Sequence, residues 1–117
     1  MIELTVVIAL LMILAAMGIA QYRNSVAHAR EAVLKQDLSI LRESIDKYCA
    51  DLNQYPDTLA ALVDKHYLRA VPVDPFTKLA DSWTFVNSDD PDHPGIRDVH
   101  SGAADVVAVD GTALVTW

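Results

Sequence analysis

Few residues of this 117-residue chain have types and spacings suited to chemistry. The four histidines lack a short metal-site spacing such as His-x-x-x-His, and the single cysteine, Cys49, has no His or Asp placed to make it a nucleophile. No glycine-rich phosphate loop, nucleophile elbow or paired-carboxylate pattern occurs. We therefore expect a protein that is not an enzyme and requires no cofactor, in which Cys49 is a buried and inert thiol.

Carboxylates near the end of the chain are the remaining candidates for a metal site. Asp98, Asp105 and Asp110 lie in a loop-rich stretch, and convergent carboxylates are the ligands that calcium prefers. An EF-hand is excluded because the twelfth position from Asp90 is Ser101, where that motif requires Glu. A solvated acidic loop is the simpler interpretation, and a calcium site formed by Asp98, Asp105 and Asp110 is the alternative.

The charge balance narrows the classes of partner. Nine Lys and Arg stand against sixteen Asp and Glu, which gives a formal net charge of -7. A nucleic-acid-binding surface needs the opposite field, so we expect no binding to DNA or RNA. A single cysteine likewise excludes an internal disulfide framework and a cysteine-based zinc site.

Glu3 is the one charged residue within an apolar segment at residues 1–20. A helix over this segment is about 30 Å long, which matches the hydrocarbon core of a bilayer. It is apolar on all sides, and nothing basic precedes it as in a cleaved secretory signal, so we predict a retained membrane helix. The bases Arg23, Arg30 and Lys35 all follow it. The positive-inside rule therefore leaves the later part in the cytoplasm, unless a basic leader has been removed.

Two interpretations of Glu3 remain open at this point. In the first, its carboxylate lies at the membrane–water boundary, where a charge near a helix end costs little. In the second, it becomes buried when such helices bundle, which requires a positive partner because an unpaired buried charge is strongly unfavourable. The N-terminal amine of a neighbouring chain is a suitable partner.

The membrane helix is predicted to continue into water. No Pro or Gly interrupts residues 19–53, so the helix reaches a total length of about 75 Å, and Gly18 is its one weak point. Its second part has an apolar stripe with spacings of 4, 3, 4, 3 and 4, formed by Leu34, Leu38, Leu41, Ile45, Tyr48 and Leu52. The stripe lasts less than three heptads, so we expect it to pack against later segments of the same chain rather than in a coiled coil.

The remaining residues, 55–117, predict a small head. Pro56 ends the rod, and Asp57 is predicted to cap a short helix whose inward residues are Leu59, Leu62 and Val63. Two prolines make residues 67–77 extended.

The β structure of the head is predicted from two stretches. Residues 83–86 are expected to form a short strand. Residues 105–117 predict a β-hairpin closed by Asp110-Gly111, the preferred type I′ turn. The head is therefore expected to be a small antiparallel sheet of about three strands laid over the stripe.

The first residues, Met1-Ile2-Glu3-Leu4-Thr5, resemble the start of a mature type IV pilin-like protein. That family reads Phe-Thr-(Leu/Met)-Ile-Glu-Leu after a leader is cleaved behind a glycine, so Met1 matches its third residue and Glu3 its Glu. Downstream, the chain is similar to the major pseudopilin of type II secretion systems. The similar segments are Tyr48 to Pro56, Tyr67 to Arg69, Val71 to Pro75 and Asp98 to Trp117. Two departures are that many relatives carry Pro about where Ala20 stands, and that the closing loop is shorter than usual.

The resemblance implies an α+β pilin-like fold, with the long N-terminal helix packed against a small antiparallel β-sheet head. It implies a single-pass protein of the bacterial inner membrane, with a periplasmic head and with a leader removed by a prepilin peptidase that also N-methylates the new terminus. An inner-membrane assembly platform, a cytoplasmic ATPase and minor pseudopilins are then partners in building a homo-oligomeric helical filament. The filament lies in the periplasm or outside the cell.

The resemblance also implies roles for particular residues. Glu3 pairs with the N-terminus of a neighbouring subunit, and apolar packing in the filament core involves residues such as Leu4, Val7, Leu11 and Leu14. Gly18 is the position that can loosen the helix during assembly. Related major pseudopilins bind calcium in the C-terminal β region, which brings Asp98, Asp105 and Asp110 forward again.

We therefore expect a structural subunit of a type II secretion pseudopilus that drives proteins across the outer membrane. Residues 1–20 form the filament core, residues 21–54 form its amphipathic continuation, and residues 55–117 form the head. One alternative is a subunit of an extracellular type IV pilus-like filament. A more distant one is a single-pass membrane anchor that presents a periplasmic binding head.

Overall fold

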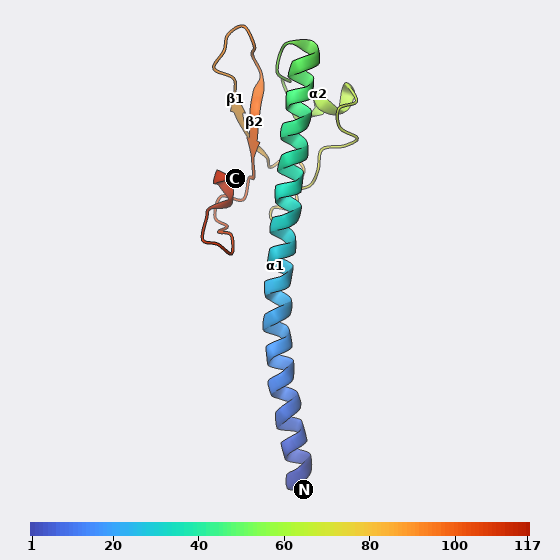
Figure 1. Ribbon diagram of the computed structural model, residues 1–117, viewed down its shortest axis with the longest axis vertical. Helices are drawn as coiled ribbons and strands as arrows, with labels where there is room; N and C mark the ends of the chain where they lie inside the picture. Colours follow the sequence, from blue (N-terminus) through green and yellow to red (C-terminus); the bar gives the residue numbers. More distant parts are fainter.

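The structure is a computed structural model that describes all residues from 1 to 117. Its elements are, in chain order, α1 (Ile2–Leu52), α2 (Leu59–Asp64), β1 (Thr84–Asn87), β2 (Ile96–His100) and the short 3-10 helix η1 (Leu114–Thr116). The molecule measures 79 × 26 × 19 Å, because α1 runs along its whole length while the other elements gather at one end (Figure 1). The predicted rod with a small α+β head is confirmed at this level.

The rod is one unbroken helix of 51 residues, which contains Gly18 without interruption. It ends where Asn53 adopts a left-handed conformation with φ 58°, and the backbone N–H of Asn53 donates to the carbonyl oxygen of Cys49 at 2.8 Å. Asparagine tolerates this conformation better than most residues and is therefore a common helix terminator. The helix thus ends at Leu52, two residues before the predicted boundary at 54.

The apolar stripe on the second part of α1 is buried almost as predicted. Its first five members form the centre of the core and are at most 6% exposed: Leu34, Leu38, Leu41, Ile45 and Tyr48. Leu52, the last helical residue, is 41% exposed, so the buried stripe ends one turn earlier than predicted. The core is completed by residues of the head that include Leu62, Val99 and Leu114.

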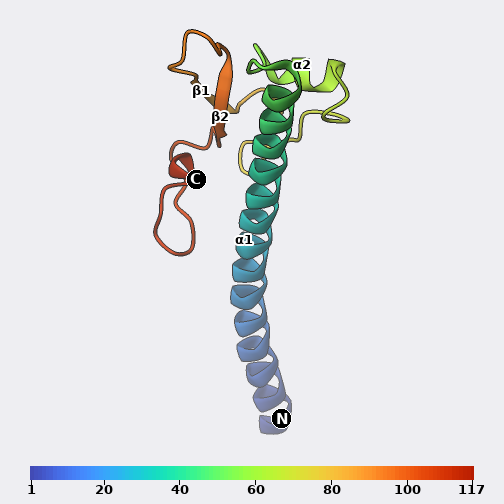
Figure 2. The same cartoon turned by 45° about the horizontal axis from the view of Figure 1, so that its top comes forward.

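The head packs on two sides of the second part of α1, the part that carries the apolar stripe. Figures 1 and 2 show the two strands on one side of the helix and α2 on another. Both β2 and α2 contact α1 directly. The second part of α1 therefore lies between elements of its own chain, whereas the first part extends away from them.

The short helix α2 forms at the predicted place with a different cap. Its N-cap is Thr58, whose hydroxyl accepts a hydrogen bond from the backbone N–H of Ala61 at 3.3 Å. Asp57 lies one residue too early to reach that N–H, so the prediction that it caps the helix is wrong. Leu59 and Leu62 face inward as expected, and Val63 is half-buried.

The sheet has two strands, of which the sequence predicted one. β1 pairs antiparallel with β2, from Thr84 opposite His100 to Asn87 opposite Ile96. Arg97 is left without a partner because the register shifts between Val86 and Asn87, which forms a β-bulge. The bulge brings the buried residues Ile96 and Val99 to the same face although they are three positions apart. The strand was missed because this spacing breaks the period-two pattern of an ordinary strand.

The predicted C-terminal β-hairpin does not form two strands. The chain does turn back at the predicted place, but residues 105–117 contain one isolated bridge, between Val107 and Ala113, followed by η1. Three residues form the loop, since the N–H of Ala108 donates to the Thr112 carbonyl oxygen and Gly111 takes φ 90°. A three-residue loop with a left-handed Gly at its end replaces the two-residue type I′ turn.

Candidate functional site

The residues predicted to drive assembly lie on the part of α1 that the head does not reach (Figures 1 and 2). The exposed fractions of Leu4, Val7, Leu11 and Leu14 are 67%, 52%, 59% and 64%. No part of the most apolar stretch of this helix is buried by the rest of the protein. The chain therefore has one helix long and apolar enough to cross a membrane.

Glu3 lies in the first turn of α1 and is exposed. The ion pairs of the structure use other carboxylates, so Glu3 has no cationic partner within its own chain. Near it, the hydroxyl of Thr5 donates to the Met1 carbonyl oxygen at 3.2 Å. A carboxylate in the first turn gains about 0.3–1 kcal/mol from the helix dipole. Any stronger partner must come from another molecule.

Gly18 leaves open space on the surface of α1. A Cβ placed on it would meet no atom within 4 Å. Its helical backbone makes it an ordinary position of α1 in this state. Glycine costs up to about 1 kcal/mol relative to alanine in a helix, so Gly18 remains the weakest point of the apolar segment.

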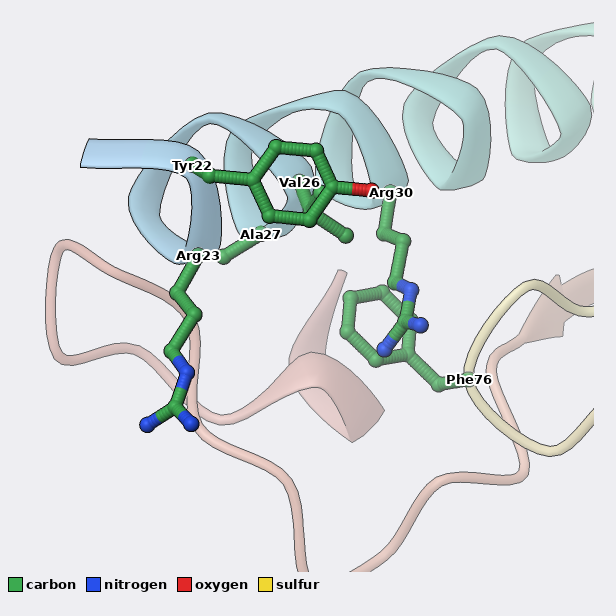
Figure 3. A pocket seen from close by; sticks show the side chains of 6 residues that line it. All are labelled: Tyr22, Arg23, Val26, Ala27, Arg30 and Phe76. Atoms are coloured by element: carbon green, nitrogen blue, oxygen red, sulfur yellow. The ribbon is translucent and has the colours of Figure 1, made fainter. Parts of the chain in front are cut away.

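A hollow of about 370 Å³ lies where α1 changes from apolar to polar (Figure 3). Five of its lining residues come from α1 and the sixth from the loop that follows α2: Tyr22, Arg23, Val26, Ala27, Arg30 and Phe76. In Figure 3 both arginines extend from the same side of the helix, and the Phe76 ring approaches from the loop. From the sequence, both arginines were recognised only as basic residues that follow the predicted membrane helix.

The second part of α1 fastens the end of the chain through Arg42. Its guanidinium group donates to a carboxylate oxygen of Asp98 at 2.8 Å and to the Val99 carbonyl oxygen at 3.1 Å. It also donates to the carbonyl oxygen of Trp117. One side chain on the helix therefore holds three oxygens from β2 and the C-terminal segment. The sequence offered no signal for this contact, because Asp98 and Trp117 lie 56 and 75 residues after Arg42.

The environment of Asp98 keeps its carboxylate ionised. Burial alone raises the pKa of Asp98, but hydrogen bonds from the Val99 N–H and from Arg42 outweigh that effect. The charges of Arg42 and His100 act in the same direction, so the pKa of Asp98 lies below its usual value. Asp98 is thus already neutralised by an arginine rather than left free for a metal ion.

The two other predicted calcium ligands lie in the C-terminal loop and are exposed. The carboxylate of Asp110 accepts hydrogen bonds from the hydroxyl and the N–H of Thr112 at 2.6 and 3.0 Å, and these lower the pKa of Asp110. Asp105 forms no ion pair. No group of three or more His, Cys, Asp or Glu side chains is placed to hold a metal ion. The structure therefore does not gather Asp98, Asp105 and Asp110 into a calcium site.

The C-terminal loop is held against α1 by contacts of different kinds. A carboxylate oxygen of Glu31 accepts a hydrogen bond from the Val109 N–H at 2.6 Å. The ammonium group of Lys35 lies 4.7 Å from the centre of the Trp117 ring, at a distance typical of a cation–π interaction. The indole N–H of Trp117 in turn donates to the Thr112 hydroxyl at 2.9 Å. Together with the Arg42 contacts, these keep the loop beside the middle of α1.

A fully buried carboxylate, Asp74, organises the loop between α2 and β1. One oxygen accepts from the Phe76 N–H at 2.8 Å, and the other accepts from the Ser101 hydroxyl at 2.6 Å. Buried carboxylates require such donors, and Asp in a turn before Pro is a common place for them. The Asp74-Pro75 pair is the signal that the sequence offers for this role, whereas the predicted extended segment rests on Pro72 and Pro75 alone.

The thiol of Cys49 is half-buried rather than buried as predicted. It lies close enough to Tyr55 to contribute to its environment, and the pKa of Tyr55 is raised by burial and then by this thiol. No His or carboxylate hydrogen bond to Cys49 is present.

No protein-family model, curated protein sequence or solved structure matches the chain.

Proposed function

We propose that this protein is a structural subunit that polymerises through the first part of α1, as the pseudopilin of a type II secretion system does. The observation that carries the proposal is a helix segment that is apolar on all sides and covered by no part of its own chain. Leaving such a segment in water is strongly unfavourable, because burying each exposed Leu or Val side chain would contribute about 1.5–3 kcal/mol. It must be covered either by lipid or by copies of itself.

A second apolar feature favours a polymer over a simple membrane anchor. Val33 and Ile40 lie on the part of α1 beyond the apolar segment, and they remain 49% and 38% exposed. They are seven residues apart, so they share one side of the helix. An anchor does not explain uncovered apolar residues at this height above a membrane. A bundle of parallel rods does, because each rod can cover this side of its neighbour.

Glu3 is the natural register charge of such a bundle. It is exposed and has no partner in its own chain. Burying it unpaired among apolar helices would be strongly unfavourable, so stacking is favoured where the carboxylate meets the N-terminal amine of a neighbour. That requirement selects one axial offset between subunits out of the many that apolar packing alone allows.

In this proposal the subunit first resides in the bacterial inner membrane with its head in the periplasm, and prepilin peptidase processes it. An inner-membrane assembly platform and minor pseudopilins then build the filament, which pushes secreted proteins through the outer membrane. An extracellular pilus-like filament uses the same helix contacts, and the two differ in where the filament ends. Calcium binding in the C-terminal region remains a prediction, and no three acidic side chains gather there to support it.

Electron microscopy of the natively processed protein, expressed with its assembly machinery, tests the polymer. Wild type is expected to form thin filaments, and Glu3→Ala is expected to form none because the register charge is lost. Glu43→Ala is the matched control: it also removes one exposed carboxylate from α1, but on the part beside the head. This control should assemble like wild type.

Two outcomes would contradict the proposal in different ways. If wild type forms no filaments although it is inserted and processed, the chain is a lone membrane anchor and the head becomes the place to seek a ligand. If Glu3→Ala assembles as well as Glu43→Ala, a polymer exists but Glu3 does not set its register.

A further inference from the structure

Arg23 and Arg30 are unpaired cations in a strongly acidic chain. Between Glu3 and Glu31 there is no Asp or Glu, so this stretch has a local charge opposite to the net charge of -7. The ion pairs of the structure use Arg42, Lys47, Arg97 and His100 as cations, which leaves both arginines without a carboxylate partner. Their charges are therefore available to an anion from outside the chain.

The position of the two arginines identifies the anion. If the apolar segment spans a bilayer, its twenty residues cover about 30 Å, and Tyr22 and Arg23 then lie in the headgroup layer. Tyrosine is enriched at this level of membrane proteins, and Tyr22 would lie there. Arg30 lies two turns higher on the same side, and long arginine side chains reach back to the interface.

The hollow between the arginines has the mixed lining that a lipid headgroup needs. Four of its six lining residues are hydrophobic, among them Val26 and Phe76. A free phosphate ion gains nothing from such a lining. A phospholipid does, because its phosphate can accept from the guanidinium groups while its glycerol and upper acyl carbons contact the apolar residues. Figure 3 shows Phe76 on the head side of the hollow, opposite the helix residues.

We propose that this hollow, lined by Tyr22, Arg23, Val26, Ala27, Arg30 and Phe76, binds the headgroup of an anionic phospholipid. The site is formed jointly by the helix and the head, so a bound lipid fixes the height of the head above the membrane. Extraction of the subunit from the membrane must break this contact. The proposal rests on the membrane insertion of the proposed function, but it does not require polymerisation.

The test uses the full chain in nanodiscs made of equal parts phosphatidylglycerol and phosphatidylcholine, with the retained lipids counted by native mass spectrometry. Wild type is expected to retain phosphatidylglycerol over phosphatidylcholine by about thirtyfold, from two arginines near an anionic lipid. Arg23→Gln/Arg30→Gln should lower this preference to near one. Arg69→Gln/Arg97→Gln is the matched control, since it removes two charges from exposed positions of the head and should retain the preference.

The other outcomes overturn the proposal. Equal loss in both double variants would mean that net charge, and not this hollow, attracts the lipid. Displacement of phosphatidylglycerol by excess inorganic phosphate would assign the arginines to a soluble anion instead. Failure of wild type to float with vesicles would refute membrane insertion itself. Floating protein that forms no filaments would refute polymerisation alone and leave the lipid site standing.

Discussion

The two parts of α1 are both rich in apolar residues, yet they have opposite fates in the folded chain. The part beside the head carries one apolar stripe, and its Leu34, Leu41 and Ile45 are completely buried. The part before it is apolar on every side, and residues such as Leu11 and Leu14 remain more than half exposed. A single stripe can be satisfied by the small head. A fully apolar cylinder cannot, because a head of this size covers only one end of the rod.

One helix therefore contains two parts whose apolar side chains contribute to different equilibria. Contacts of the second part of α1 hold the head. The first part is uncovered by its own chain, and in the proposed function it governs membrane residence and association. The two parts meet at the short stretch around Arg23 and Arg30, which the head covers only in part and which is less apolar than the segment before it. Substitutions in the two parts should therefore change different measurements.

The largest expected effect is from truncating a buried leucine on the second part of α1. Leu41→Ala removes a side chain that is 0% exposed, and the cavity should lower the free energy of unfolding of the head by about 2–5 kcal/mol. Urea unfolding of the detergent-solubilised chain, followed by the fluorescence of the buried Trp83, measures it. Leu11→Ala, the matched substitution on the first part, should leave this transition in place. A similar loss in both variants would show that the two parts are not independent.

The Arg42 contact gives the next largest effect. Arg42→Gln removes the ion pair with Asp98 and leaves two carbonyl oxygens without their donor, which should cost about 1–3 kcal/mol. Lys47→Gln is the control on the same helix, since it removes an exposed pair with Glu43 at 3.0 Å that is worth about 0.3–0.5 kcal/mol. The same urea experiment measures both. If the two variants lose equal stability, the end of the chain does not depend on Arg42.

The sequence was sufficient to predict α1 and its stripe because their signals are local and repeated. An apolar run without Pro, followed by leucines that recur at three- and four-residue spacings, predicts one long helix. The same holds for the uncovered apolar segment, whose length and composition identify it without any knowledge of the head.

The sheet and the end of the chain were not predictable in this way. β2 contains a bulge at Arg97 that breaks the alternation of apolar residues, and this phase change becomes visible only when the pairing with β1 is known. Asp110-Gly111 correctly indicated a reversal, but the loop length chooses between a hairpin and a single bridge. The three acids looked like calcium ligands because sequence does not show that Arg42 already neutralises Asp98.

Acidification should weaken the attachment of β2 to α1 through Asp98. Its pKa in the folded protein lies below that of the unfolded chain, so its stabilising contribution is complete above about pH 4 and is lost as the pH falls through the folded value. Urea midpoints measured between about pH 6 and pH 3 should therefore fall less steeply in Asp98→Asn than in wild type. Asp105→Asn, at an exposed residue without an ion pair, should retain the wild-type slope. Parallel slopes in all three proteins would mean that the Arg42 pair does not contribute to acid sensitivity.

The smallest expected effect concerns a mismatch within the second part of α1. Asp37 is half-buried, and its pKa is raised by burial and by the nearby carboxylate of Asp74. A raised pKa means that the ionised carboxyl of Asp37 is disfavoured in the folded protein. The free energy of unfolding is therefore highest, as far as Asp37 contributes, below the pKa of the unfolded chain, and this contribution is lost as the pH rises past the pKa of the folded protein. At neutral pH, Asp37→Asn should raise the free energy of unfolding by a few tenths of a kcal/mol, because solvent screens most of the repulsion.

The pH dependence of that gain distinguishes its cause. Below about pH 3 the wild-type carboxyl is protonated in both states, and the advantage of Asp37→Asn should vanish. Asp46→Asn is the matched control, since it neutralises an exposed carboxylate on the same helix and should give no comparable gain. A gain that persists at low pH would assign the effect to better packing of the amide rather than to relief of the partly buried charge and of its repulsion by Asp74. In that case the charge of Asp37 would not measurably weaken the packing of the second part of α1 against the head.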